Sequence, residues 1–74
     1  MKLKCRVKGI PSPNVEWYFN RQRVDDGVKY TIQREGDKCV LTIPHPRIKD
    51  SGIYECRARN EAGKDSCSAN VAVR

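Results

Sequence analysis

The side chains with the greatest chemical potential in this chain are four cysteines and a single histidine, which are donors that zinc prefers. Structural zinc sites are commonly built from Cys-x-x-C pairs, which hold two thiolates close together. None of Cys5, Cys39, Cys56 and Cys67 belongs to such a pair, and His45 lies between two prolines. The spacing therefore predicts structural cysteines, and we expect no metal site and no cofactor.

No arrangement of residues suited to catalysis is present in the 74-residue sequence. His45 lies in a Pro-rich turn, out of register with any serine or cysteine nucleophile, and there is no glycine-rich phosphate loop. A chain of this length is also too short to build a substrate cleft and a catalytic apparatus in addition to a core. We expect a protein that is not an enzyme.

The positive charge has one local concentration. The chain carries 15 Lys and Arg against 9 Asp and Glu, a net charge of +6. Basic residues alternate near the amino terminus, so they project from one face of a strand, and a later lysine is expected to join them. The candidate basic binding face consists of Lys2, Lys4, Arg6, Lys8 and Lys38. It could bind an acidic filament, heparan sulfate or an anionic membrane surface, or it could be a solvated face that discourages edge aggregation.

Nucleic acid and membrane insertion both fit the sequence poorly. The chain has one Trp, three Tyr and one Phe, and Trp17 and Tyr54 are assigned to the core, so no stacking platform accompanies the charge. No apolar run approaches the roughly 18 residues that a membrane span needs. We expect no nucleic-acid partner and no membrane span.

Apolar and polar residues alternate along most of the chain, which is the pattern of half-buried β-strands. No segment keeps a 3.6-residue period, so no helix longer than a turn is expected. Loops are expected at residues 9–13, 20–27 and 44–46, which are rich in proline or in polar turn residues. The predicted strands cover residues 3–7, 15–19, 30–32, 39–43, 53–59 and 67–73. Short strands with turn signals between them predict an antiparallel sandwich or barrel, with residues 1–74 as a single domain.

The most specific motif is the run Asp50-Ser51-Gly52-Ile53-Tyr54-Glu55-Cys56. Together with Cys5 and Trp17, it reproduces the Cys…Trp…Tyr-x-Cys order of the immunoglobulin superfamily, which the sequence resembles from residue 3 to residue 73. Within that superfamily the chain is similar to the I-set. The sequence pattern typical of that set is matched at Trp17-Tyr18, at Leu41-Thr42-Ile43 and at residues 58–63. The resemblance implies an all-β, immunoglobulin-like antiparallel sandwich.

The resemblance assigns structural roles to several residues. It implies a cross-sheet pair of Cys5 and Cys56, with Trp17 packed beside it and with Leu41 and Tyr54 in the core. A bridge between these two cysteines would stabilise the fold by roughly 4 kcal/mol.

The remaining cysteines and the crossover between the sheets follow from the same resemblance. Cys39 and Cys67 are expected to be free buried thiols, and with the absence of an Asn-x-Ser/Thr motif they favour a reducing compartment. Asp50 and Gly52 mark the crossover. Asp50 is expected to pair with Lys29, where the family usually has an arginine, although lysine lacks the bidentate fork.

The family begins with an A strand that precedes the first cysteine strand, B, and this sequence starts directly at the B strand. We therefore expect a sandwich that lacks the N-terminal A strand and exposes the edges of strands B and G. Unpaired edges present free backbone groups, so such a domain is expected to be marginal alone or to self-associate through them.

The resemblance implies a non-catalytic structural and protein-interaction module, like the I-set domains of giant muscle proteins such as titin, twitchin, projectin and obscurin. In that interpretation it is a cytoplasmic mechanical spacer and docking surface, whose partner is a sarcomeric or cytoskeletal filament or a neighbouring immunoglobulin domain. The alternative is an extracellular adhesion or receptor domain whose basic face binds a partner protein or a glycosaminoglycan. Fold alone does not decide between them.

Overall fold

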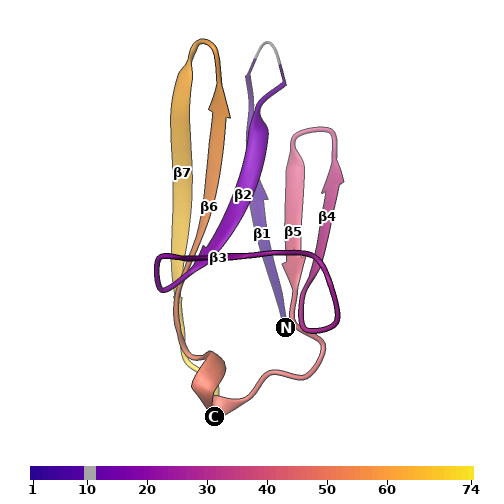
Figure 1. Ribbon diagram of the computed structural model, residues 1–74, viewed down its shortest axis with the longest axis vertical. Coiled ribbons are helices and arrows are strands. Elements are labelled where there is room, and N and C mark those ends of the chain that lie inside the picture. Colours follow the sequence, from indigo (N-terminus) through magenta and orange to yellow (C-terminus); the bar gives the residue numbers. More distant parts are fainter. Residues whose placement is uncertain (10–11) are drawn as a thin grey trace.

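Two antiparallel β-sheets face each other in the computed structural model, which describes residues 1–9 and 12–74 (Figure 1). The smaller sheet has the order β1-β5-β4 and contains β1 (Lys2–Arg6), β4 (Thr31–Glu35) and β5 (Lys38–Thr42). The larger has the order β3-β2-β6-β7 and contains β2 (Asn14–Phe19), β3 (Gln22–Val24), β6 (Gly52–Asn60) and β7 (Gly63–Val71). A single 3-10 turn, η1 (Ile48–Asp50), precedes β6. The predicted antiparallel sandwich is confirmed.

Strand β3 is the element that the sequence did not predict, because residues 20–27 were expected to be a loop. Phe19 pairs with Gln22, so Asn20 and Arg21 form a two-residue hairpin turn, with φ angles of 47° and 70°. Positive φ at both central residues matches the twist of a β-hairpin. The loop expected at residues 9–13 includes positions 10–11, which lie outside the described residues.

The core lies between the sheets and contains inward-facing residues from both. Trp17, Leu41 and Tyr54 are at most 3% exposed, as their core assignment requires. Burying a large apolar side chain of this kind contributes roughly 1.5–3 kcal/mol. The buried apolar set is Cys5, Val7, Trp17, Val24, Cys39, Leu41, Ile43, Tyr54, Cys56 and Ala58.

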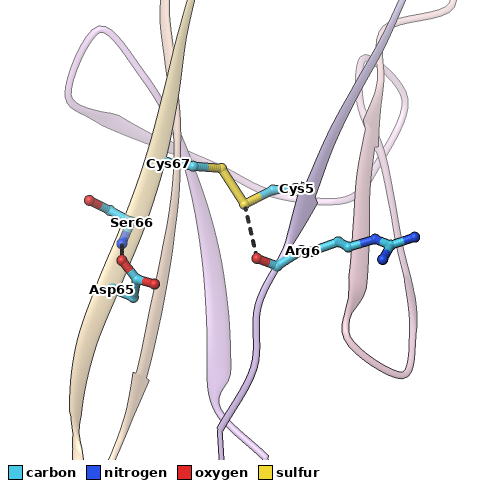
Figure 2. The surroundings of a disulfide bond; sticks show 5 residues. All are labelled: Cys5, Arg6, Asp65, Ser66 and Cys67. Carbon is cyan, nitrogen blue, oxygen red and sulfur yellow. Dashed lines mark hydrogen bonds between the residues drawn. A yellow bond between two sulfur atoms is a disulfide. The ribbon is translucent and has the colours of Figure 1, made fainter.

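One long side of the sandwich is open. Strand β1 pairs with β5 and strand β7 pairs with β6, and neither has a second partner among the described residues. A disulfide between Cys5 and Cys67 joins these two edge strands, so both edges lie on the same side of the molecule (Figure 2). Residues 63–70 of β7 are exposed, and Val71 is half-buried.

Candidate functional site

The outer face of the β1-β5-β4 sheet carries a group of cations. Cross-strand register places Arg6 directly opposite Lys38, and residues opposite one another in an antiparallel pair share a face of the sheet. We call this group the basic face; it consists of the exposed residues Lys2, Lys4, Arg6 and Lys38. Lys8, predicted to continue the row, is exposed but lies beyond the end of β1.

A shallow hollow of about 530 Å³ lies on this face. It is lined by Lys2, Lys4, Gln33, Arg34, Glu35, Lys38 and Val40. Arg34 is engaged elsewhere, because its guanidinium donates to the hydroxyl of Ser12 at 2.8 Å and to the carbonyl of Pro13. The basic face itself forms no ion pair within residues 1–9 and 12–74. Lys38 lies directly opposite Arg6 on β1 and directly opposite Glu35 on β4, so it has a like charge on one side and a carboxylate on the other. Like charges directly opposite each other, as at Arg6 and Lys38, are destabilising.

Within the described residues, the backbone of β1 is hydrogen-bonded to another strand on one side only. Met1 exchanges both backbone hydrogen bonds with Ile43, at 2.8 and 2.9 Å, and the N–H of Val7 donates to the carbonyl of Asp37 at 2.7 Å. These contacts fix the alternation of an antiparallel ladder, in which every second residue directs its N–H and C=O away from the partner. Between Met1 and Val7, the residues that face away from β5 are Lys2, Lys4 and Arg6.

The cysteine pairing differs from the one that the resemblance implied. Cys5 is bonded to Cys67, not to Cys56, so Cys67 is not a free thiol (Figure 2). The register explains how both pairings fit the sequence, because Cys56 and Cys67 are direct cross-strand neighbours on the same face of their sheet. Cys67 is on edge strand β7 of the larger sheet, and the disulfide connects it to Cys5 on edge strand β1 of the smaller sheet.

Cys39 and Cys56 are the free thiols, and both are buried. Cys39 pairs in register with Cys5, so all four cysteines lie in one layer of the sandwich. Burial raises the pKa of the Cys56 thiol to about 12 and also raises that of Cys39. Both are therefore neutral at physiological pH and behave as small apolar core residues.

The crossover between the sheets is held by Asp50, which is 1% exposed. One carboxylate oxygen pairs with Nζ of Lys29 at 2.8 Å, and the other accepts the Arg47 N–H at 2.8 Å. These contacts, with the Lys29 hydrogen bond the larger, hold the pKa of Asp50 below its usual value of 3.8, and the same bond raises the pKa of Lys29. The expected Asp50–Lys29 pair is thus present, and Tyr54 completes the crossover by donating its hydroxyl to the Asp50 carbonyl at 2.7 Å.

Gly52 permits a close approach at the same crossover. Its φ of 155° is rarely adopted by other residues, and an added Cβ would lie 2.6 Å from Oδ1 of Asn20 and 2.8 Å from the Phe19 ring. The same Asn20 oxygen accepts the Ile53 N–H at 2.9 Å, which ties the β2–β3 turn to the start of β6. Gly52 is therefore structural.

The outer face of the larger sheet carries paired charges. Arg57 donates to Glu55 at 2.6 Å and lies over the Tyr18 ring at 4.0 Å from its centroid. Arg23 pairs with Glu16 at 3.2 Å and with Asp25 at 3.3 Å. These cations belong to the sheet opposite the basic face.

Within the part of the chain that the structure describes, no group of three or more His, Cys, Asp or Glu is arranged to hold a metal ion. No described helix is long and apolar enough to cross a membrane. Sequence reasoning missed Gln33, Glu35 and Val40 as neighbours of the cations. The tight turn at Gly36 is visible in the sequence and could have predicted these neighbours, because it sets residues 31–35 and 38–42 in register.

Comparisons with known proteins agree over almost the whole chain. The family description "Immunoglobulin I-set domain" matches residues 1–73. The muscle M-line assembly protein unc-89 of Caenorhabditis elegans is 38% identical over 97% of the chain, and a vascular endothelial growth factor receptor kdr-like protein of Danio rerio is 36% identical over 99%. The chain spans only 1% and 5% of these relatives. The crystal structure of a titin M10–obscurin-like 1 Ig complex is 34% identical with a TM-score of 0.94, covering 100% of this chain and 76% of that one.

Proposed function

The chain belongs to the immunoglobulin I-set family, and we propose that it acts as a non-catalytic spacer and docking module in a modular muscle or cytoskeletal protein. The proposal is carried by the match of residues 1–73 to the I-set family, together with 38% identity to a muscle M-line assembly protein over 97% of the chain. In this role the domain lies in the cytoplasm, and its partner is a filament protein or a neighbouring immunoglobulin domain.

The docking part of the proposal is supported by the basic face. Exposed cations without internal partners retain their hydration and their long-range field, which speeds encounters with an acidic surface. The titin M10 structure, solved in complex with an obscurin-like 1 immunoglobulin domain, supplies a precedent among relatives for protein partners of such modules.

The spacer part is supported by the long β6–β7 hairpin. Each of these two strands spans 9 residues, and they are joined by ladder pairs from Gly52–Val71 to Asn60–Gly63. The continuous ladder holds these two strands together as one extended unit, which suits a spacer.

A second candidate is an extracellular receptor or adhesion domain. It is favoured by the receptor relative from Danio rerio and by the Cys5–Cys67 disulfide, because disulfides persist mainly in oxidising compartments. In that role the basic face would bind a partner protein or a glycosaminoglycan.

The two candidates are separated by pelleting the chain with F-actin and with myosin filaments, and by heparin chromatography, at physiological salt. Filament binding that is saturable and weakened by Lys4→Glu, but not by Lys64→Glu, supports the proposed function. Lys64 is an exposed lysine on β7 and serves as the matched control. Absence of binding to both filaments, combined with heparin retention that Lys4→Glu abolishes, overturns it in favour of the second candidate.

A further inference from the structure

We propose that a hollow between β2 and β4 binds a small apolar molecule that carries a carboxylate. The proposal goes beyond the docking function, because this hollow contains no residue of the basic face and lies on the side of the sandwich away from β1 and β7. Three observations carry it: a gap between the two sheets, a buried hydrogen-bond donor without an acceptor, and an excess of positive charge around the gap.

The gap adjoins the part of β2 that β3 does not cover. Strand β3 pairs with residues 17–19 of β2, so residues 14–16 have no described neighbour on that side. In the other sheet, β4 lies at the end opposite β1 and therefore borders the same side. The hollow between them has a volume of about 500 Å³, which is within the range of small-molecule sites.

The apolar part of the lining comes from both sheets. Val15 and Trp17 belong to β2, Ile32 to β4 and Cys39 to β5. Val15 and Ile32 are half-buried, so part of their apolar surface remains uncovered. A ligand that places a hydrocarbon group here removes that surface from water, which favours binding.

Trp17 supplies a donor that lacks an acceptor. Its side chain is 3% exposed, and its Nε1 is shielded from solvent without a hydrogen-bond partner in residues 1–9 and 12–74. Buried polar groups of folded proteins nearly always have a partner, and an indole nitrogen can only donate. A bound molecule that completes this site must therefore present a hydrogen-bond acceptor.

The charges around the hollow favour an anionic acceptor. Three arginines and one glutamate belong to its described lining. Glu16 is paired with Arg23 at 3.2 Å, so these two charges largely cancel. The hydrogen bonds of Arg34 go to uncharged oxygen atoms, and Arg59 forms no ion pair with any described residue. Because a carboxylate accepts hydrogen bonds from guanidinium and indole groups alike, it matches both the charge and the unpartnered donor.

Ligands of the same shape but different charge fit less well. An amine would add a cation beside the arginines and offer no acceptor to Trp17. An alcohol could accept the indole N–H but would leave the arginines unneutralised. The expected order of affinity is therefore carboxylate, then alcohol, then amine.

The test compares three ligands that share one apolar body: phenylbutyrate, phenylbutanol and phenylbutylamine. Binding to the folded chain is followed by NMR titration, in which the indole N–H of Trp17 is a single signal because the chain has one tryptophan. Phenylbutyrate should bind about tenfold more tightly than phenylbutylamine, with phenylbutanol between them. The Trp17 N–H signal should move downfield as phenylbutyrate binds, because the N–H gains an acceptor.

Two matched variants test the role of charge. Arg59→Gln removes an unpaired cation of the hollow and should weaken phenylbutyrate severalfold. Lys64→Gln is the control, because Lys64 is an exposed cation directly opposite Arg59 that does not line the hollow. It should leave the affinity almost unchanged.

A third variant tests the donor. Trp17→Phe removes the indole N–H and should weaken phenylbutyrate and phenylbutanol, with binding followed at the backbone amides. Urea midpoints verify that each variant is folded. If Trp17→Phe does not fold, the comparison of Arg59→Gln with Lys64→Gln still decides.

Equal affinity for phenylbutyrate and phenylbutylamine overturns the proposal, as does equal weakening by Arg59→Gln and Lys64→Gln. A Trp17 N–H signal that none of the three ligands moves would show that water alone satisfies this donor, which also overturns it. Filament binding is a separate measurement on the basic face. Its failure while phenylbutyrate binds as expected would count against the proposed function only.

Discussion

The outer faces of the two sheets carry similar charged residues in opposite circumstances. On the larger sheet, Arg57 is held by Glu55 and by the Tyr18 ring, and Arg23 by Glu16. On the smaller sheet, the basic face forms no ion pair within the residues described. The larger sheet therefore uses its charges to orient its own side chains, whereas the smaller sheet leaves its charges available to another molecule.

The largest expected effect comes from removing the covalent link between the two sheets. Cys5→Ser removes the bridge to Cys67, which joins residues 62 positions apart. We expect the free energy of unfolding to fall by about 4 kcal/mol, because the unfolded chain regains the entropy of an open loop. Urea denaturation without reductant measures this loss.

Wild-type protein in excess reductant is the control for this prediction and should approach the Cys5→Ser midpoint. A midpoint that is insensitive both to the substitution and to reductant would show that the bridge does not stabilise the fold.

A paired lysine in the segment that precedes β4 offers the next test. Asp50→Asn removes the charge that Lys29 neutralises and should cost about 1.5–3 kcal/mol at pH 7, the range for hydrogen bonds to a charged group. Lys4→Gln, on the unpaired basic face, should change stability by less than about 0.5 kcal/mol. Urea midpoints of the two variants compare a cation that is paired with a buried carboxylate with one that forms no ion pair among the described residues.

The pH dependence of Asp50 sharpens this test. Because its pKa is lower in the folded than in the unfolded chain, its contribution is fully present above an unfolded value near 3.8 and is lost as the pH falls through the folded value. Asp50→Asn should therefore lose less stability between pH 5 and pH 2 than the wild type. Parallel acid profiles for the two proteins would contradict the assignment.

Charge reversal on the larger sheet should be destabilising. Glu55→Lys removes the partner of Arg57 and places two cations side by side, at an expected cost of about 0.5–1 kcal/mol. Thermal unfolding at low salt should reveal the loss, and added salt should reduce it by screening. A loss that is unchanged by salt would assign it to packing.

Charge reversal on the basic face should instead raise the stability of the folded chain. Arg6→Glu replaces the like-charged neighbour of Lys38 by a carboxylate and should stabilise the chain by about 0.2–1 kcal/mol. The measurement is again the thermal midpoint at low salt, and Arg6→Gln separates lost repulsion from gained attraction. Destabilisation by Arg6→Glu would mean that the positive charges of the basic face do not repel one another measurably.

The sequence predicted most of the strands and the composition of the basic face, because both depend on the two-residue period of a strand. Lys4 and Arg6 share a face in any register. Strand β3 was missed because its polar residues Gln22 and Arg23 carry no alternating apolar signal, and its turn at Asn20 contains no glycine.

The disulfide and the free edge were beyond the reach of the sequence for a different reason. Cys56 and Cys67 have the same inward parity and lie side by side, so spacing cannot choose which of them meets Cys5. Likewise, the sequence places cations on β1, but which backbone groups are free follows only from the hydrogen bonds of Met1 and Val7.

The position of Trp17 gives the domain an internal optical reporter. It is the one tryptophan in the chain, is 3% exposed, and is the cross-strand neighbour of the Cys56 thiol. Sulfur in van der Waals range quenches indole emission, and an apolar surrounding shifts that emission to the blue. Unfolding should therefore produce a red-shifted and brighter signal, so the loss of the core around Trp17 can be followed by fluorescence without any added label.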